Sequence, residues 1–275
     1  MKHNATHDKR VAVLSDPHCG HVAGLTPPEY AYAVTDDRTK HDKFAIIQDV
    51  TWRWFYAEAV KIRPVDVLLL NGDAIDGRGE KAGGVECITT DRTKQCEMAI
   101  RVIKVLQPKH VILTYGTTYH VASSGEEWEG AIAKTLADSN TFSGDVAVGA
   151  HEWFSVNGVV FDAKHHVAMG AAPQTQFSSI TRDSIWQMLW AMRREAPRAN
   201  IIIRSHLHTY LFAKTSDFTG IVTPGLQAYS KYGAKQVSRT IDYGFLHFDV
   251  TKEGNWTCVD HLARFAEFTP TVLKF

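Results

Sequence analysis

Short apolar runs alternate with longer, helix-like segments along most of the chain. The short runs consist mainly of valine, leucine, isoleucine and alanine, a composition typical of strands that are buried on both faces. We predict such strands at residues 11–15, 65–70, 110–115 and 201–205. In the longer segments apolar residues recur at helical spacing, which predicts helices at residues 42–62, 91–106, 125–138 and 179–195.

The second half of the chain adds shorter strands. Asn157-Gly158 is a strong signal for a two-residue hairpin turn, and it separates strand-like residues 152–156 from 159–163. Further short strands are expected at residues 210–216, 219–223, 242–250 and 256–261. Helix–strand alternation followed by hairpins predicts an α/β fold with two mixed sheets covered by helices. We expect residues 1–275 to form a single domain.

Composition narrows the class of protein. Thirty basic and thirty acidic residues give a formal net charge of zero, which weighs against tight binding through phosphate neutralisation. The polar N-terminus does not resemble a secretory signal, and no apolar run is long enough to span a bilayer. The four cysteines are scattered without a CxxC pair, as expected for reduced thiols. We therefore expect a cytoplasmic protein without a membrane partner.

Carboxylates and imidazoles follow the apolar runs, at the points where buried strands would end. The clusters are Asp16-Pro17-His18, Gly72-Asp73-Ala74-Ile75-Asp76, His165-His166 and Ser205-His206-Leu207-His208. Ligands of α/β proteins enter at the carboxyl ends of strands, so these side chains are expected to converge on a metal site. Imidazole and carboxylate together suit divalent ions such as Mn, Fe or Zn.

The order and spacing of these clusters resemble the calcineurin-like metallophosphoesterases. That family carries Asp-x-His, Gly-Asp-x-x-Asp, Gly-Asn-His-Asp/Glu, a lone His and Gly-His-x-His, and the resemblance runs from residue 11 to about 210. It implies a four-layer α-β-β-α sandwich and two divalent transition-metal ions (Mn, Fe, Zn or Ni). By resemblance, the first ion would be held by Asp16, His18, Asp73 and His208. The second would be held by Asp73, His165 and His206, so that Asp73 bridges the two.

The third block departs from the family pattern. It reads Gly116-Thr117-Thr118-Tyr119-His120, so Thr117 stands where the family has its Asn ligand, and His120 comes later than the family's His. His120 could assist the leaving group as a catalytic residue, the interpretation preferred here, or could replace the missing ligand. The fourth block offers two histidines. We favour His165 as the ligand, with His166 facing the substrate.

The resemblance implies metal-dependent hydrolysis of a phosphate ester by a phosphatase or phosphodiesterase. The substrate could be a nucleotide or a nucleic acid. A nuclease of the SbcD type is one alternative. Another is a non-catalytic scaffold with a degenerate metal site, which the irregular third block favours and the other intact blocks oppose.

Several residues near the motifs have simpler structural explanations. Glu126 and Glu127 are expected to complement the dipole of the following helix. Trp186 and Trp190 are expected in the core rather than as stacking platforms for bases. Lys164 and Arg204 adjoin the ligands, but neighbouring strand residues alternate faces, so they could equally point away from the site.

Overall fold

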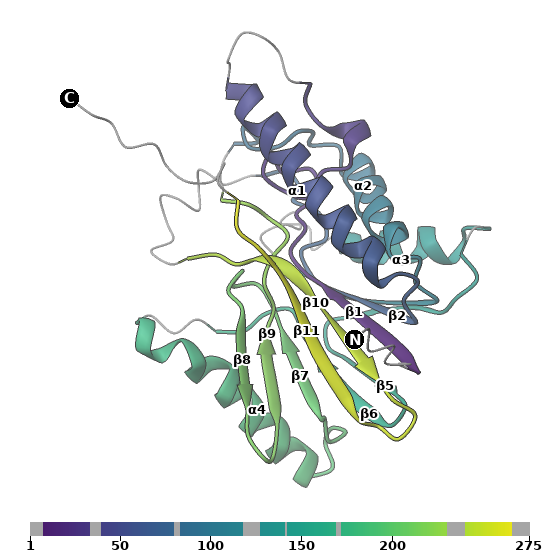
Figure 1. The fold of residues 1–275 in the computed structure, drawn as a ribbon, viewed down its shortest axis with the longest axis vertical. Coiled ribbons are helices and arrows are strands. Elements are labelled where there is room, and N and C mark those ends of the chain that lie inside the picture. The colour runs from purple at the N-terminus through teal and green to yellow at the C-terminus, as the bar shows by residue number, and fades with distance from the viewer. Residues whose placement is uncertain are drawn as a thin grey trace, which may run out of the picture.

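The protein consists of two mixed β-sheets with helices on their outer faces, as Figure 1 shows for a computed structural model of the chain. The structure describes residues 8–33, 40–79, 83–117, 127–140, 142–168, 172–229 and 240–265. The predicted α/β class and the α-β-β-α layering are both confirmed.

The first sheet is mostly parallel. Its strands are β1 (Lys9–Leu14), β2 (Val67–Asn71), β3 (His110–Thr114), β4 (Val146–Gly149), β10 (Tyr243–Val250) and β11 (Trp256–Ala263). Their order is β11-β10-β1-β2-β3-β4. The four strands β1 to β4 run parallel, whereas β10 is antiparallel to both β1 and β11.

The second sheet is parallel at its centre and antiparallel at both edges. Its strands are β5 (Glu152–Val156), β6 (Val159–Ala163), β7 (Ile201–Arg204), β8 (Leu211–Lys214) and β9 (Thr219–Val222), in the order β5-β6-β7-β9-β8. Strands β6, β7 and β9 run parallel, and β5 and β8 pair antiparallel at the edges. The expected hairpin is present, because Asn157 and Gly158 both adopt the positive φ that its turn requires.

In the described part of the chain, four α-helices cover the sheets. They are α1 (Lys40–Ile62), α2 (Arg92–Val105), α3 (Trp128–Ala137) and α4 (Gln176–Met192), with short 3-10 turns η1 (Pro28–Tyr30) and η3 (Pro173–Thr175). Helices α1 to α3 lie on the first sheet and α4 on the second (Figure 1). Among the described residues, no helix has both the length and the apolar character needed to cross a bilayer.

Alternation along the strands creates three hydrophobic layers. Val11 and Val13 of β1 pack between the sheets, whereas Ala12 and Leu14 pack against α1 to α3. In β7, Ile201 and Ile203 face the first sheet, and Ile202 faces α4. The apolar runs are therefore continuous because both faces of each strand are buried.

Two features differ from the sequence-based expectation. Strand β4 was not predicted, because it is a short edge strand whose residues are partly exposed. Most of the large apolar residues of α4 face solvent rather than the core: Met192 is 74% exposed and Trp186 is 52% exposed. The helix packs through Ile180 and through three polar residues, Ser179, Ser184 and Gln187. A Cβ on Gly220 of β9 would lie 2.6 Å from Ser184 Oγ, so helix and sheet approach too closely for bulky side chains.

Candidate metal centre

All six predicted metal ligands meet where strands of the two sheets end. Asp16 and His18 follow β1, Asp73 follows β2, His165 follows β6, and His206 and His208 follow β7. They form two groups, and the ligand atoms within each group lie within 4.8 Å of one another. The groups are Asp16–His18–His208 and Asp73–His165–His206.

The two groups are contiguous. His165 Nε2 lies 3.1 Å from Asp73 Oδ2 and 3.8 Å from Asp16 Oδ1. His18 Nε2 lies 3.9 Å from Asp73 Oδ2 and 4.0 Å from Asp16 Oδ1. His208 Nε2 is 3.3 Å from the same oxygen of Asp16. Each carboxylate therefore faces imidazoles from both groups, as a ligand shared between two ions would.

The site contains buried polar atoms that the described part of the chain leaves unsatisfied. Asp16 Oδ1 and His165 Nε2 are buried and make no hydrogen bond to any described residue. Burying such groups without a partner is costly. Because both atoms point into the same cluster, a cation placed among them would satisfy both, and the donor set of carboxylate oxygens and imidazole nitrogens fits a divalent ion.

Backbone strain is concentrated at the same residues. Five of the six candidate ligands have a positive φ, between 42° and 73°: Asp16, His18, Asp73, His206 and His208. Only three other non-glycine residues in the described part of the chain share this conformation: Gln107, Asn157 and Arg194. Left-handed backbone is unfavourable for residues with a Cβ and persists where surrounding structure enforces it, often at functional sites.

Hydrogen bonds behind the cluster orient its imidazoles. The Nδ1–H of His165 donates to the backbone carbonyl of Asn71 at 2.8 Å, so Nε2 faces the carboxylates. The Asn71 side chain donates to Ser205 Oγ and to the Lys164 carbonyl, and accepts from the Thr114 hydroxyl. Asn71 thus links the ends of β2, β3, β6 and β7. The sequence interpretation missed this role, although Asn71 directly precedes Gly72-Asp73.

Asp76 supports His18 in a similar way. Its Oδ1 lies 3.4 Å from His18 Nδ1, on the side of the ring away from the other carboxylates. A carboxylate in this position fixes the ring orientation and strengthens the imidazole as a ligand. The second carboxylate of the Gly-Asp-x-x-Asp motif is therefore placed to orient His18.

Thr117 contacts Asp73 directly. The Thr117 backbone N–H donates to Asp73 Oδ1 at 2.6 Å, and its hydroxyl lies 3.2 Å from both carboxylate oxygens. Gly116 permits this approach, because a Cβ there would lie 2.1 Å from Asp73 Oδ1. The place of the family's Asn is thus occupied by a hydroxyl group next to the central carboxylate. His120 and Glu126 lie outside the described residues.

Glu129, in the first turn of α3, also holds the Asp73 turn. Its buried Oε1 accepts a hydrogen bond from the Ala74 backbone N–H. Burial, together with the negative charge of Asp73, raises the pKa of Glu129. This residue was not predicted; the signal for it was a carboxylate in the helix that follows the third block. Glu127, which was expected to complement the helix dipole, is the exposed N-cap residue.

His165 and His166 are neighbours in the sequence, but their side chains lie in different environments. His165 is buried against Asp16 and Asp73, whereas His166 is exposed, with its ring 4.9 Å from the His206 ring. Burial and the neighbouring His165 lower the pKa of His166. His166 is thus placed at the open side of the cluster, where it can meet an incoming ligand.

The imidazoles of the cluster compensate the negative charges of Asp16 and Asp73 only in part. Burial raises the pKa of Asp16, but His208 and His165 outweigh it and bring the value to about 2. Burial lowers the pKa of His165, but Asp73 and Asp16 outweigh it and raise the value to about 10. The carboxylates therefore attract a positive charge, which a metal ion would supply in place of the His165 proton.

Similarity to known proteins is found among solved structures. No family model matches the sequence, and a search of curated proteins finds no match. Solved structures similar to this chain include an archaeal phosphodiesterase, at 13% identity and a TM-score of 0.44, covering 92% of this chain and 99% of that one. They also include Vps29 from Chaetomium thermophilum (7% identity, TM-score 0.43, 92% and 97% covered). A predicted phosphoesterase from Streptococcus pneumoniae is similar as well (10%, 0.36, 92% and 98%).

Proposed function

We propose that this chain is a metal-dependent phosphoesterase that hydrolyses a phosphate ester with two divalent transition-metal ions. One observation carries the proposal: six carboxylate and imidazole side chains converge in two contiguous groups at the ends of four strands. Such buried groups are costly to assemble without a cation, and two adjacent cation sites suit phosphoryl transfer.

In this proposal one ion is held by Asp16, His18 and His208, and the other by Asp73, His165 and His206. His18 lies near both carboxylates, which supports Asp73 as the bridging ligand. Bound ions of this kind supply an activated water and neutralise the charge that develops on the phosphoryl oxygens. Mn, Fe, Zn and Ni all suit this mixture of nitrogen and oxygen ligands.

The chain's own residues then orient the site and the substrate. Asn71 and Asp76 fix the rings of His165 and His18, and Thr117 fixes the Asp73 carboxylate. His166, exposed beside His206, can donate a hydrogen bond to a phosphoryl oxygen. His120 is proposed to protonate the leaving group. The substrate is a phosphate ester, with nucleotides and nucleic acids included in that class.

Both sheets contribute ligands, since β1 and β2 belong to the first sheet and β6 and β7 to the second. The site would be lost if the sheets separated. We therefore also propose that residues 1–275 act as one domain.

The test combines metal analysis with a substrate panel. Purified protein is analysed for Mn, Fe, Zn and Ni, then assayed with p-nitrophenyl phosphate, bis(p-nitrophenyl) phosphate and single-stranded DNA. The Asp73→Asn variant serves as the inactive reference. We expect one to two ions per chain and hydrolysis of the monoester or the diester. Activity on DNA alone would favour the nuclease. Bound metal without any activity would favour the scaffold, and absence of metal, even after addition of Mn²⁺ or Ni²⁺, would refute the proposal.

A further inference from the structure

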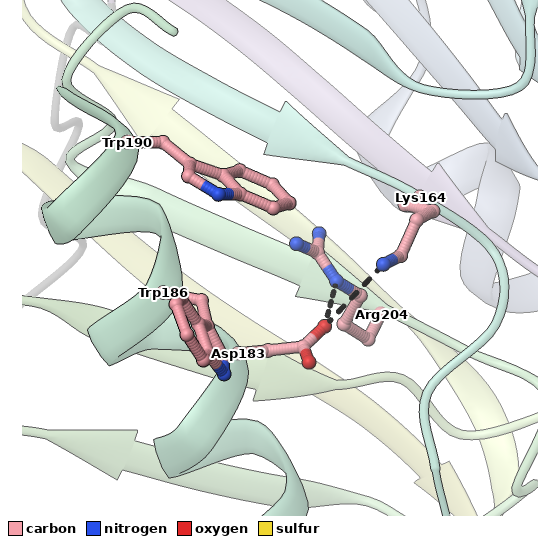
Figure 2. A pocket seen from close by; sticks show the side chains of 5 residues that line it. All are labelled: Lys164, Asp183, Trp186, Trp190 and Arg204. Carbon is pink, nitrogen blue, oxygen red and sulfur yellow. Dashed lines mark hydrogen bonds and ion pairs between the residues drawn. The ribbon is translucent and has the colours of Figure 1, made fainter. Parts of the chain in front are cut away.

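A second pocket lies on the outer face of the second sheet, beneath α4. Its volume is about 260 Å³, and Lys164, Asp183, Trp186, Trp190 and Arg204 line it. Figure 2 shows the two indole rings from α4 beside the charged ends of the other three side chains. The volume is slightly below the range of sites for drug-sized ligands, so the pocket suits a small, compact ligand.

The pocket is separate from the metal centre, although the two share chain segments. Ala163 and Ile203 face the first sheet, so Lys164 and Arg204, one residue later, project toward α4. His165, one residue further, turns back to Asp16 and Asp73. Strand alternation thus sends neighbouring residues to two different sites, which agrees with the expectation that Lys164 and Arg204 point away from the metal ligands.

The aromatic wall of the pocket is open to solvent. Asp183, Trp186 and Trp190 share one face of α4, because residues three or four positions apart are neighbours on a helix. Trp186 is half exposed, contrary to the core position expected from the sequence. A large aromatic surface left in water beside a pocket is available for stacking with a flat ligand.

The polar floor of the pocket is rigid and offers both donors and an acceptor. Arg204 is buried, with its Nε bonded to Asp183 Oδ2 at 2.8 Å and its Nη1 bonded to Asp162 Oδ1 at 2.6 Å. Its Nη2 makes no hydrogen bond to any described residue, and neither does Asp183 Oδ1. The Lys164 ammonium lies 3.7 Å from Asp183 and is partly exposed. These groups match a ligand edge that carries both a carbonyl oxygen and an N–H.

We propose that this pocket binds the base of a nucleoside or nucleotide, stacked on Trp186 and Trp190, with its polar edge on Arg204, Lys164 and Asp183. The carboxylates of Asp162 and Asp183 balance the positive charges of Arg204 and Lys164, so the floor favours a neutral heterocycle over a bare phosphate. Base–aromatic stacking is a common source of affinity for nucleic-acid bases. The proposal does not depend on phosphoesterase activity, because it involves none of the metal ligands.

The test is calorimetric titration of the full chain with guanosine, which carries no phosphate and so has no anchor at the metal centre. Trp186→Ala should weaken binding about tenfold or more, and Trp186→Phe should restore most of it, because the phenyl ring still stacks. Phe177→Ala removes an exposed aromatic from the same helix outside the pocket and should leave binding unchanged. Ribose 5-phosphate, which can bind only at the separate metal centre, should not displace guanosine.

Three results would overturn the proposal. Guanosine could fail to bind at millimolar concentration. Trp186→Ala could bind guanosine as tightly as the wild type. Ribose 5-phosphate could compete with guanosine, which would mark the pocket as an anion site. Circular dichroism of each variant establishes that it is folded before the titrations are compared.

Discussion

Thr117 and Asp73 are in contact through both the backbone and the side chain of the threonine. The N–H donates to Asp73 Oδ1 at 2.6 Å, and the hydroxyl lies 3.2 Å from both carboxylate oxygens. The carboxylate central to the candidate site is therefore held by Thr117. This contact makes Thr117 the natural place to test how the second ion is bound.

Thr117→Val and Thr117→Asn should change metal binding in opposite directions. Valine keeps the backbone donor and the side-chain shape but removes the hydroxyl, so affinity for the weaker ion should fall by about 10–100-fold, as for other positioning partners. Asparagine supplies a carbonyl oxygen as a further ligand and should strengthen the binding of that ion. Equilibrium dialysis with Mn²⁺ measures the metal affinity of both variants, and Thr257→Val, at an exposed position, serves as the control. If both variants match the wild type, Thr117 has no part in metal binding.

Asp73→Asn should abolish phosphoesterase activity and the thermal stabilisation that metal provides. An ion that binds only the folded chain stabilises it by about 2.7 kcal/mol at a concentration 100 times its Kd. Adding Mn²⁺ should therefore raise the melting temperature of the wild type and leave that of Asp73→Asn almost unchanged. The exposed Asp138→Asn should behave like the wild type. A variant that keeps the full metal-dependent shift would mean that Asp73 is not a ligand.

Asp76→Asn tests whether the second carboxylate of the motif orients His18. We expect a loss of about 10–100-fold in metal affinity, with activity reduced rather than abolished, because the ligand itself remains. Asp145→Asn is a matched control, since Asp145 forms a 3.0 Å carboxylate–imidazole pair with His110 at the surface. Equal metal affinity in the two variants would contradict a positioning role for Asp76.

The strand pattern allowed the fold to be predicted, and it also allowed the residues that meet in the candidate metal centre to be selected. Residues 11–14 and 201–203 are apolar at every position because their strands separate two hydrophobic layers, and polar residues follow where the strands end. Asp16 and His206 could therefore be selected by position alone, before any contact was known.

Other parts of the site depend on contacts that a sequence pattern does not encode. Glu129 and Asn71 reach the site from elements whose periodicity gives no sign of it. Glu129 accepts one hydrogen bond from the Asp73 turn, whereas Asn71 bonds to the His165 ring and to the ends of three neighbouring strands. The exposure of Trp186 follows from the close packing of Ser184 on Gly220, a relationship between distant residues. The left-handed backbone at the ligands likewise results from tertiary structure.

Asp162 should make stability dependent on pH. Burial raises its pKa, but the hydrogen bond with His151 and the charge of Arg204 outweigh it, so the pKa lies below the usual 3.8. A carboxyl group whose pKa is lower in the folded state than in the unfolded state stabilises the fold at pH values above its unfolded-state pKa. This stabilisation is lost as the pH falls through its folded-state pKa. Breaking this buried pair in Asp162→Asn should cost about 3–5 kcal/mol at pH 7.

The difference in unfolding free energy between Asp162→Asn and the wild type should therefore shrink as the pH falls below about 4. Urea titrations across this range measure it. Asp49→Asn, which removes the exposed partner of Arg53, should cost no more than about 0.5 kcal/mol. A difference that stays constant down to pH 2 would show that the charge of Asp162 is not the source of its contribution.

His120 provides the last test, since the third block is where this chain departs most from the metallophosphoesterase pattern. Thr117 contacts Asp73 at the position of the missing ligand, which favours the proposed role of His120 at the leaving group. His120→Ala should then slow an alkyl phosphate, with its basic leaving group, far more than p-nitrophenyl phosphate, by about 10²–10⁴-fold for a lost general acid. Metal content should stay unchanged. Loss of one ion, with equal slowing on both substrates, would instead make His120 a ligand, and an unchanged enzyme would make it structural.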